Sequence, residues 1–434
     1  MYDWANSAFQ TTVITVLIGP YLTALAQQSV GDNGVVFDLG VFGAVTAKSF
    51  YPYCIAASVF LQTLMFPLLG AAADYSRFRK ALMMAFCFAG AAATCLLFFL
   101  SARTYIAGGL LFIAANVCFG AALVLYNAFL NDVAPASMRN AVSSRGYALG
   151  YLGGGALLAC NLVLILAGPG IGVSKDLAVR LSLLSAGLWW AGFGAFAFSR
   201  LRSRPPSQAV PPDASAVGTA LRGLGRSFAH LGRLPHTLRF LAGYMLFNDG
   251  IQTVISISSV FLAQELFVAR GLPADESFLI SLILMVQFVG VGGALLFERI
   301  ARAISTKNAI LLSLVLWTGI VIYAYGFLQN TTQAWAMGAV IALVLGGSQA
   351  LSRSLFSLMI PVGLEASFFG LYEITERGTS WIGPLIFGAV VAATNSYRQA
   401  ILSLIVLFLS GMVVLALTDT DRAIRDASPS PARL

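Results

Sequence analysis

Charged and amide side chains occupy a few positions inside otherwise apolar stretches of this chain. Carboxylates, guanidinium groups and amides in such surroundings can bind a polar solute or carry protons, and they are costly to bury without a partner. Hydrogen bonding between helices is the alternative role for the uncharged ones. The residues that we expect to line a substrate or proton pathway are Asp3, Asn6, Gln10, Tyr126, Asn127, Asp249, Gln252, Gln349, Arg353, Glu373 and Glu376.

Covalent catalysis and metal binding find little support in the residue inventory. The two histidines, His230 and His236, fall in the middle of the chain outside the apolar runs. The five cysteines fall inside apolar runs without a Cys-x-x-Cys pair, which is typical of small packing residues. The sequence also lacks the Walker A pattern that binds ATP. We therefore expect neither an enzyme nor a cofactor or metal site.

The composition indicates a membrane protein. Of the 434 residues, 58% are hydrophobic and 10% are charged. A water-soluble core cannot bury so much apolar surface, so the excess must face lipid. Many apolar runs have about 20 residues, the length that a helix needs to cross a bilayer. Because the runs lack the alternation of barrel strands, we expect an all-α membrane protein.

The apolar runs between charged or Pro/Gly breaks predict twelve membrane-spanning helices. Six lie near 4–27, 50–72, 81–101, 106–130, 142–167 and 178–199, and six near 237–267, 277–300, 308–328, 334–357, 367–394 and 397–418. Polar residues are most frequent in 334–357 and 367–394. The expected domains are a six-helix half over 1–199, a cytoplasmic linker over 200–236, a second six-helix half over 237–418 and a tail over 419–434.

The linker between the predicted halves is rich in Arg, Pro and Ser. Within it, Leu221, Leu224, Phe228 and Leu231 recur at helical spacing while arginines occupy other faces. This pattern is typical of an amphipathic helix on an anionic membrane surface. A disordered linker is the alternative.

The positions of lysine and arginine predict the orientation, because cationic loops resist translocation. With both ends in the cytoplasm, 19 of these residues fall on the inside and six on the outside. The net charge of +8 then belongs to the cytoplasmic face, and no nucleic acid is needed to explain it. Arginine outnumbers lysine 22 to 4, which suggests a GC-rich bacterial genome and hence a bacterial inner membrane.

The two predicted halves contain similar polar patterns. Asp3 near the start of the first span corresponds to Asp249 in the seventh, and Asp74 after the second span corresponds to Glu298 after the eighth. Diverged six-helix copies are the organisation of many alternating-access transporters. We therefore expect two related halves.

The turn after the second span reads GAAADYSRFRK over residues 70–80. Its glycine permits close approach of two helices, and its aspartate can accept hydrogen bonds from an arginine or from the N–H groups of a helix N-terminus. The residues that we expect in a cytoplasmic gate are Gly70, Asp74, Arg77, Arg79 and Arg145. An ordinary basic turn is the alternative, but the stretch resembles the G-x-x-x-D-x-x-R-x-[R/K] signature of the major facilitator superfamily.

Longer segments resemble one branch of that superfamily. They are YDWANSAF at 2–9, YNAFLNDVAP and RGYALGYLGGG within 126–155, and GGSQALSRSLF and FFGLYEITERG within 346–378. The branch is the vacuole-effluxer family, also called the unknown major facilitator family, and the resemblance runs nearly end to end. It implies a secondary transporter whose eukaryotic members are associated with export of amino acids from the vacuole. The chain departs from the family pattern after the fourth span, at Asn131, Asp132, Ser137 and Met138. It departs again in the eleventh span, at Tyr372, Glu373 and Glu376, and this leaves the substrate open.

We therefore expect a secondary active transporter of a small organic solute, amino acids or related zwitterions first, that works by rocker-switch alternating access. Asp3, Asp249 and Arg353 would supply both charge signs, and protons are the expected ion if transport is coupled. The other expected partners are membrane lipids, and the protein is expected to be a monomer. An exporter of a lipid-like or hydrophobic compound is the alternative. A membrane-embedded enzyme is less favoured, because the residues offer neither a catalytic dyad nor metal ligands. A transporter-like receptor is less favoured, because the sequence has no large soluble signalling domain.

Overall fold

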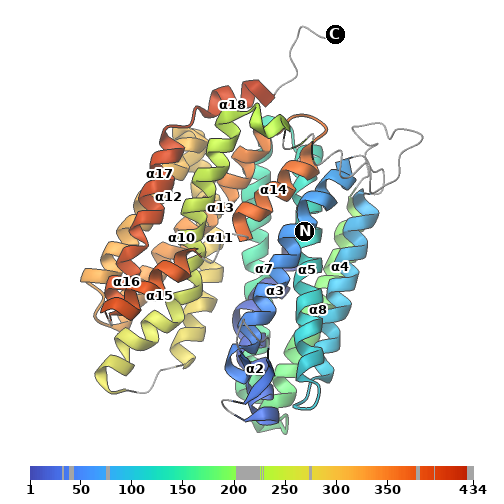
Figure 1. The fold of residues 1–434 in the computed structure, drawn as a ribbon, viewed down its shortest axis with the longest axis vertical. Coiled ribbons are helices and arrows are strands. Elements are labelled where there is room, and N and C mark those ends of the chain that lie inside the picture. The colour runs from blue at the N-terminus through green and yellow to red at the C-terminus, as the bar shows by residue number, and fades with distance from the viewer. Residues whose placement is uncertain are drawn as a thin grey trace. The chain divides into compact units, whose positions relative to one another are not determined.

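The chain consists mostly of long helices, as its computed structural model shows (Figure 1). The structure describes residues 1–31, 34–38, 44–74, 79–201, 229–272, 276–377, 382–394 and 396–427, together with Gly225 and Ser227. Within these residues, 11 helical segments are long and apolar enough to cross a membrane. The predicted all-α membrane protein is therefore confirmed.

The predicted span over 367–394 accounts for the difference between twelve and 11. It corresponds to two helices of 13 residues each, α14 (Glu365–Arg377) and α15 (Ile382–Thr394), and residues 378–381 between them lie outside the described part of the chain. The other polar candidate, 334–357, is one continuous helix. The amphipathic helix predicted in the linker lies outside the described residues at Leu221, Leu224 and Phe228.

The chain divides into two compact units. Unit one comprises Met1–Met65, Phe78–Tyr126 and Leu149–Ser203. Its elements are α1 (Tyr2–Ala8), the π-helix η1 (Phe9–Leu17), α2 (Ile18–Val30), β1 (Val35–Asp38), β2 (Ala44–Thr46), most of α3 (Ala47–Asp74), α4 (Arg79–Leu96), η3 (Leu97–Phe99), most of α5 (Tyr105–Ala128), the later part of α7 (Arg139–Ala167), η5 (Gly168–Ile171) and α8 (Lys175–Arg200).

Unit two comprises Phe66–Arg77, Asn127–Ala148 and Arg204–Leu434. Besides the ends of α3 and α5, the start of α7, α14 and α15, its elements are α6 (Leu130–Val133), η4 (Ala136–Met138), α10 (Pro235–Leu266), η6 (Val268–Arg270), α11 (Glu276–Ile304), α12 (Thr306–Gly326), α13 (Thr331–Leu358), α16 (Tyr397–Ser403), α17 (Ile405–Ala416) and α18 (Thr420–Ala427). These units describe compactness rather than repeats, so the two predicted six-helix halves stay a prediction.

Local sequence explains where several helices begin. Ser174 accepts a hydrogen bond from the backbone N–H of Leu177 at the start of α8, and Asn330 does the same for Gln333 at the start of α13. Along the helices, large apolar side chains lie exposed, as at Phe60, where 64% of the surface is accessible. A soluble protein would bury such side chains, whereas a bilayer solvates them.

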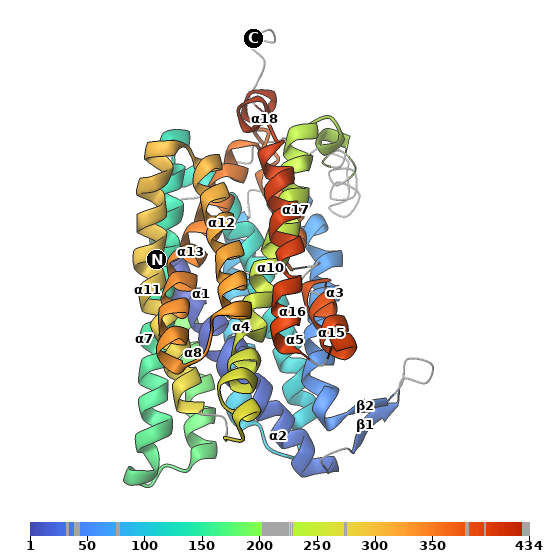
Figure 2. The same cartoon turned by 90° about the vertical axis from the view of Figure 1, so that its left-hand side faces the viewer.

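The first span is not a uniform α-helix. Over η1 the backbone is π-helical, and at its end the N–H of Ile18 donates five residues back, to the Val13 carbonyl. The Thr15 hydroxyl donates to the carbonyl of Gln10 at 2.9 Å. After α2, strands β1 and β2 pair antiparallel and form a small hairpin that lies beside α2 (Figure 2).

Glycines bring helices into close contact in each unit. In unit one, a Cβ on Gly150 of α7 would lie 2.7 Å from the Ser7 hydroxyl, so α7 packs closely on α1. In unit two, Gly383 of α15 lies against Thr253 of α10 in the same way. Ser7 donates to the Asp3 carbonyl and Thr253 to the Asp249 carbonyl, both at 2.7 Å. The first spans of the two predicted halves therefore share one side-chain hydrogen bond, which joins each aspartate carbonyl to a hydroxyl four residues later.

Candidate functional site

A buried carboxylate marks the start of the first span in unit one. Asp3 on α1 is 7% exposed, and its Oδ2 accepts a hydrogen bond from the Tyr126 hydroxyl on α5. The ring of Tyr2 lies beside that of Tyr126, with 4.9 Å between the centroids. A Cβ on Gly150 would lie 3.4 Å from the Asp3 Cβ, so α7 closes the third side. Asp3 is thus held by a phenol in aromatic surroundings.

The other two predicted residues of the first span differ in exposure. Asn6 is buried at 5% exposure, one turn after Asp3. Gln10 is exposed and lies in the π-helical segment. Because a π-helix has a wider turn than an α-helix, an α-helical projection misplaces residues after Phe9.

A buried arginine organises the polar interior of unit two. Arg353 on α13 is 4% exposed. Its Nε donates to the Ser143 hydroxyl at 2.9 Å, and its Nη2 donates to the Ser143 carbonyl at 3.1 Å. Its Cζ lies 4.4 Å from the ring centroid of Tyr147, a cation–π distance. Two residues of α7 thus hold the guanidinium, Ser143 by hydrogen bonds and Tyr147 by a cation–π contact.

Asn127 links this arginine to a buried glutamate. Its Oδ1 accepts from Arg353 Nη1 at 3.3 Å, and its Nδ2 donates to Glu373 Oε1 at 2.7 Å. Glu373 on α14 is 0% exposed. The side-chain amide of Asn127 therefore contacts both charged groups. Because its oxygen accepts from Arg353 and its nitrogen donates to Glu373, the orientation of the amide is fixed. Such a network keeps opposite charges buried at a tolerable cost.

Asp249 on α10 forms a separate buried site in unit two. It is 2% exposed, and its Oδ2 accepts from the backbone N–H of Gly383 at the start of α15, at 2.7 Å. The other oxygen, Oδ1, has no hydrogen-bond partner among the described residues. The helix N-terminus favours the negative charge. The structure thus gives Asp249 and Arg353 different neighbours.

The remaining predicted pathway residues are less buried than these groups. Gln252 and Gln349 are half-buried, and so is Glu376 on α14. The backbone carbonyl of Glu376 accepts from Asn248 Nδ2 at 3.2 Å. In unit two, the side-chain amide of Asn248 thus links α10, the predicted seventh span, to α14.

Sequence reasoning did not single out three residues of this region. They are Ser143 and Tyr147, which contact Arg353, and Tyr244 on α10, whose ring stacks on Tyr372 with 4.5 Å between the centroids. A helical pattern was available, because Ser143 and Tyr147 are four residues apart, as are Tyr244 and Asn248. Each pair presents two polar groups on one face of a helix.

The predicted gate contains an aspartate that caps a helix. Asp74 is fully buried, and its two carboxylate oxygens accept from the backbone N–H groups of Ala366 and Ser367, each at 2.8 Å. These N–H groups belong to the first turn of α14, which otherwise leaves them unpaired. Gly70 lies against the Ala366 carbonyl, so no side chain separates the two backbones.

The three arginines of the predicted gate differ in what the structure describes of them. Arg77 lies outside the described residues. Arg79 begins α4 and is half-buried, while Arg145 on α7 is exposed. Among the described residues, no group of three His, Cys, Asp or Glu side chains could hold a metal ion.

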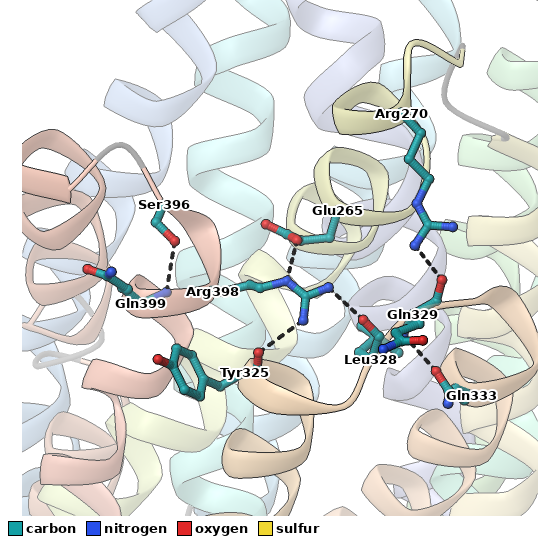
Figure 3. Close-up of polar contacts among 9 residues, drawn as sticks. All are labelled: Glu265, Arg270, Tyr325, Leu328, Gln329, Gln333, Ser396, Arg398 and Gln399. Carbon is teal, nitrogen blue, oxygen red and sulfur yellow. Dashed lines mark hydrogen bonds and ion pairs between the residues drawn. The ribbon is translucent and has the colours of Figure 1, made fainter.

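A further polar cluster ties the C-terminal ends of α10 and α12 to the start of α16 (Figure 3). Arg398 pairs with Glu265 at 2.7 Å, and it donates to the carbonyls of Tyr325 at 2.9 Å and Leu328 at 2.6 Å. Arg270 donates to the carbonyl of Gln329 nearby. The carbonyls at the end of α12 thus receive cationic donors, which a helix C-terminus favours.

Comparison with known families gives one match that spans most of the chain. The profile of the family described as "Vacuole effluxer Atg22 like" matches residues 1–138 and 131–428. The MFS-type transporter YxiO of Bacillus subtilis is 29% identical over 427 residues, which cover 97% of this chain and 95% of YxiO. Autophagy-related protein 22 of Coccidioides immitis is 30% identical over 468 residues, covering 91% of this chain and 76% of that protein.

Solved structures with the same fold are also transporters. The major facilitator superfamily transporter FucP in its outward conformation superposes with a TM-score of 0.67 at 11% identity, covering 96% of this chain and 98% of FucP. A bacterial homologue of the iron transporter ferroportin gives a TM-score of 0.63 at 14% identity, covering 96% of each chain. At these identities the likeness concerns the fold alone.

Proposed function

Because the chain belongs to the vacuole effluxer Atg22-like family of major facilitator transporters, we propose that it moves small zwitterionic organic solutes, amino acids first. Its family and its structural neighbours are transporters and not enzymes, as the sequence predicted. The autophagy-related relatives support the proposal by their family name, vacuole effluxer. Transport would proceed by alternating access in a rocker-switch motion.

The observation that carries this proposal is the buried network of Arg353, Asn127 and Glu373. Ionised side chains in membrane spans are expensive, and in transporters they mark the path of a polar cargo. A path for a lipid-like compound needs apolar walls and gains nothing from two buried charges. The network therefore favours a polar solute over the hydrophobic alternative.

Proton coupling is part of the proposal. Asp3, Asp249 and Glu373 are buried carboxylates on spans one, seven and eleven. Asp249 has one oxygen without a partner among the described residues, so it can take a proton without breaking its bond to Gly383. A carboxylate of this kind can alternate between charged and neutral forms during a cycle.

The proposed location is a bacterial inner membrane, with both ends in the cytoplasm. The excess of Lys and Arg on the loops assigned to that side supports the orientation. The likeness to YxiO of Bacillus subtilis supports a bacterial plasma membrane. The monomeric state and the gate at Gly70, Asp74, Arg77, Arg79 and Arg145 belong to the same proposal.

Flux through reconstituted protein tests this function. Proteoliposomes would be loaded with unlabelled amino acids and assayed for counterflow of labelled ones at several pH values. We expect saturable counterflow that depends on pH in the wild type and loses its pH dependence in Asp249→Asn. Asp426→Asn is the matched control, because Asp426 is exposed, pairs with the exposed Arg422 of its own helix and should leave the flux unchanged.

Two outcomes would contradict the proposal. If Asp249→Asn keeps the full pH dependence, coupling through this carboxylate is wrong. If no amino acid exchanges but lysolipids stabilise the protein against heat, the hydrophobic alternative takes its place.

A further inference from the structure

We infer that Ser143 occupies the edge of Arg353 that binds a carboxylate, and that the carboxylate of the transported solute takes this place when α7 moves away from α13. The inference rests on the transporter function proposed above and deepens it, because it names a group that the cargo must carry. Ser143 lies on α7 and Arg353 on α13. Both are buried, with exposures of 0% and 4%.

Two neighbouring N–H groups of Arg353 donate to two oxygen atoms of Ser143. Nε donates to the hydroxyl oxygen at 2.9 Å, and Nη2 donates to the backbone carbonyl oxygen at 3.1 Å. Nε–H and Nη2–H are parallel, and a guanidinium uses such a pair to bind both oxygens of a carboxylate. The two oxygens of Ser143 therefore lie where the two oxygens of a bound carboxylate would lie.

Other contacts fix the orientation of the guanidinium. On the far edge, Nη1 donates to the Oδ1 of Asn127 at 3.3 Å. The ring of Tyr147 covers one face, with 4.4 Å between its centroid and the Cζ of Arg353. These contacts direct the Nε–Nη2 edge toward α7. The edge that suits an anion is thus the one that Ser143 occupies.

Ser143 also joins α7 to α13 directly. Its hydroxyl donates to the carbonyl of Ala350 at 2.8 Å. One turn earlier on α7, Nη1 of Arg139 donates to the carbonyl of Ser357 at 2.7 Å. Arg139, Ser143 and Tyr147 follow each other at intervals of four residues, so they lie on one face of α7. A movement of this face away from α13 would break the bonds together.

The proposed transport cycle requires such a movement. Helix α7 belongs to the predicted half over 1–199, and α13 belongs to the predicted half over 237–418. In alternating access the two halves separate on one side of the membrane at a time. A buried guanidinium that loses its partners is strongly destabilising. A solute carboxylate that replaces Ser143 removes this cost, so its binding favours the separation of α7 from α13.

Matched ligands test the inference on the purified full-length protein at neutral pH. Leucine, 4-methylpentanoate and isoamylamine share one side chain and present a zwitterion, a carboxylate and an ammonium group. Phenylalanine, 3-phenylpropionate and phenethylamine form a second set. Their affinities are measured from thermal unfolding at increasing ligand concentration.

Replacing Ser143 should raise the affinity for carboxylates. Ser143→Ala removes the acceptor of Nε, so we expect it to bind the amino acids and the acids about fivefold tighter than the wild type does. Its affinity for the amines should be unchanged. Arg353→Lys keeps the charge but loses the pair of parallel donors, so it should bind the acids about tenfold more weakly. A serine with only a structural role would lower the melting temperature without tightening the binding of any ligand.

Hydrogen exchange of the wild type gives a second readout. Because the carboxylate displaces Ser143, the backbone amides of residues 139–148 should exchange faster when 4-methylpentanoate is bound. Ser313→Ala is the matched control, since the buried hydroxyl of Ser313 donates to the Ile310 carbonyl of its own helix at 2.6 Å. It should bind every ligand like the wild type. Ser143→Thr keeps the hydroxyl and should also retain the wild-type affinities.

Three outcomes would overturn the inference. They are equal carboxylate affinities in the wild type and Ser143→Ala, no binding of any carboxylate, and slower exchange over 139–148 when 4-methylpentanoate binds. The exchange result applies to the wild type and so decides the question even where Ser143→Ala does not fold. Tighter carboxylate binding in Ser143→Ala without counterflow of any amino acid would refute the transporter function and leave the inference. Amino-acid counterflow with unchanged carboxylate affinities would do the reverse.

Discussion

Replacing Asp74 tests whether a single carboxylate holds the start of α14. Its two oxygens are the acceptors of the Ala366 and Ser367 N–H groups in a site without solvent. A buried donor left without a partner costs about 1–3 kcal/mol, so Asp74→Ala should lose about 2–6 kcal/mol of stability. Asp74→Asn keeps one acceptor oxygen and should lose about half as much. The order wild type, Asn, Ala is therefore the expected order of stability.

Thermal unfolding of the purified variants measures this order. Asp426 provides the control, because its side chain and that of its partner Arg422 are 38% and 63% exposed. Exposed pairs of this kind contribute at most about 1 kcal/mol. Asp426→Ala should therefore melt close to the wild type. Equal losses in Asp74→Ala and Asp426→Ala, or no loss in either, would refute the capping argument.

Three further substitutions test other contacts. Gly70→Ala places a methyl group against a backbone carbonyl of α14 and should cost about 1–3 kcal/mol in thermal unfolding, whereas Gly292→Ala, with open space around it, should cost nothing. Arg398→Met removes three hydrogen bonds at the ends of two helices and should lower the melting temperature, while the exposed Arg422→Met should not. Asn127→Ala leaves an arginine and a glutamate without their shared amide and should abolish counterflow with a loss of about 2–4 kcal/mol; unchanged flux would show that the network does not serve transport.

Sequence reasoning recovers the features that depend on local composition. Apolar runs of the required length gave the spans, because a helix must cover a fixed hydrocarbon thickness. The turn at residues 70–80 predicts that Asp74 accepts hydrogen bonds from an arginine or from the N–H groups of a helix N-terminus. The structure shows such bonds from the N-terminus of α14. Eleven spans follow the expected pattern, and the polar segment over 367–394 is divided between α14 and α15.

Partners distant in sequence could not be derived in the same way. Ser143 and Arg353 are 210 positions apart, and nothing in either segment states that α7 and α13 meet there. The direction in which Gln10 points could not be derived for a different reason, since projection on an α-helix assumes 3.6 residues per turn and the π-helix departs from it. Long-range packing and irregular backbone therefore limit how much of the candidate site the sequence alone predicts.

The π-helix in the first span has a consequence for the length of that span. The π-helix accommodates one more residue than an α-helix of the same length would, between two anchored positions. Before the π-helix, Asp3 accepts a hydrogen bond from Tyr126, and after it, Tyr21 donates one to Asp176 at 2.8 Å. Deleting one residue from Phe9–Leu17 would allow a regular α-helix but would turn one end by about 100° against the other. Both phenol–carboxylate bonds could then not form together. The π-helix thus sets the phase of the first span relative to its two anchoring bonds.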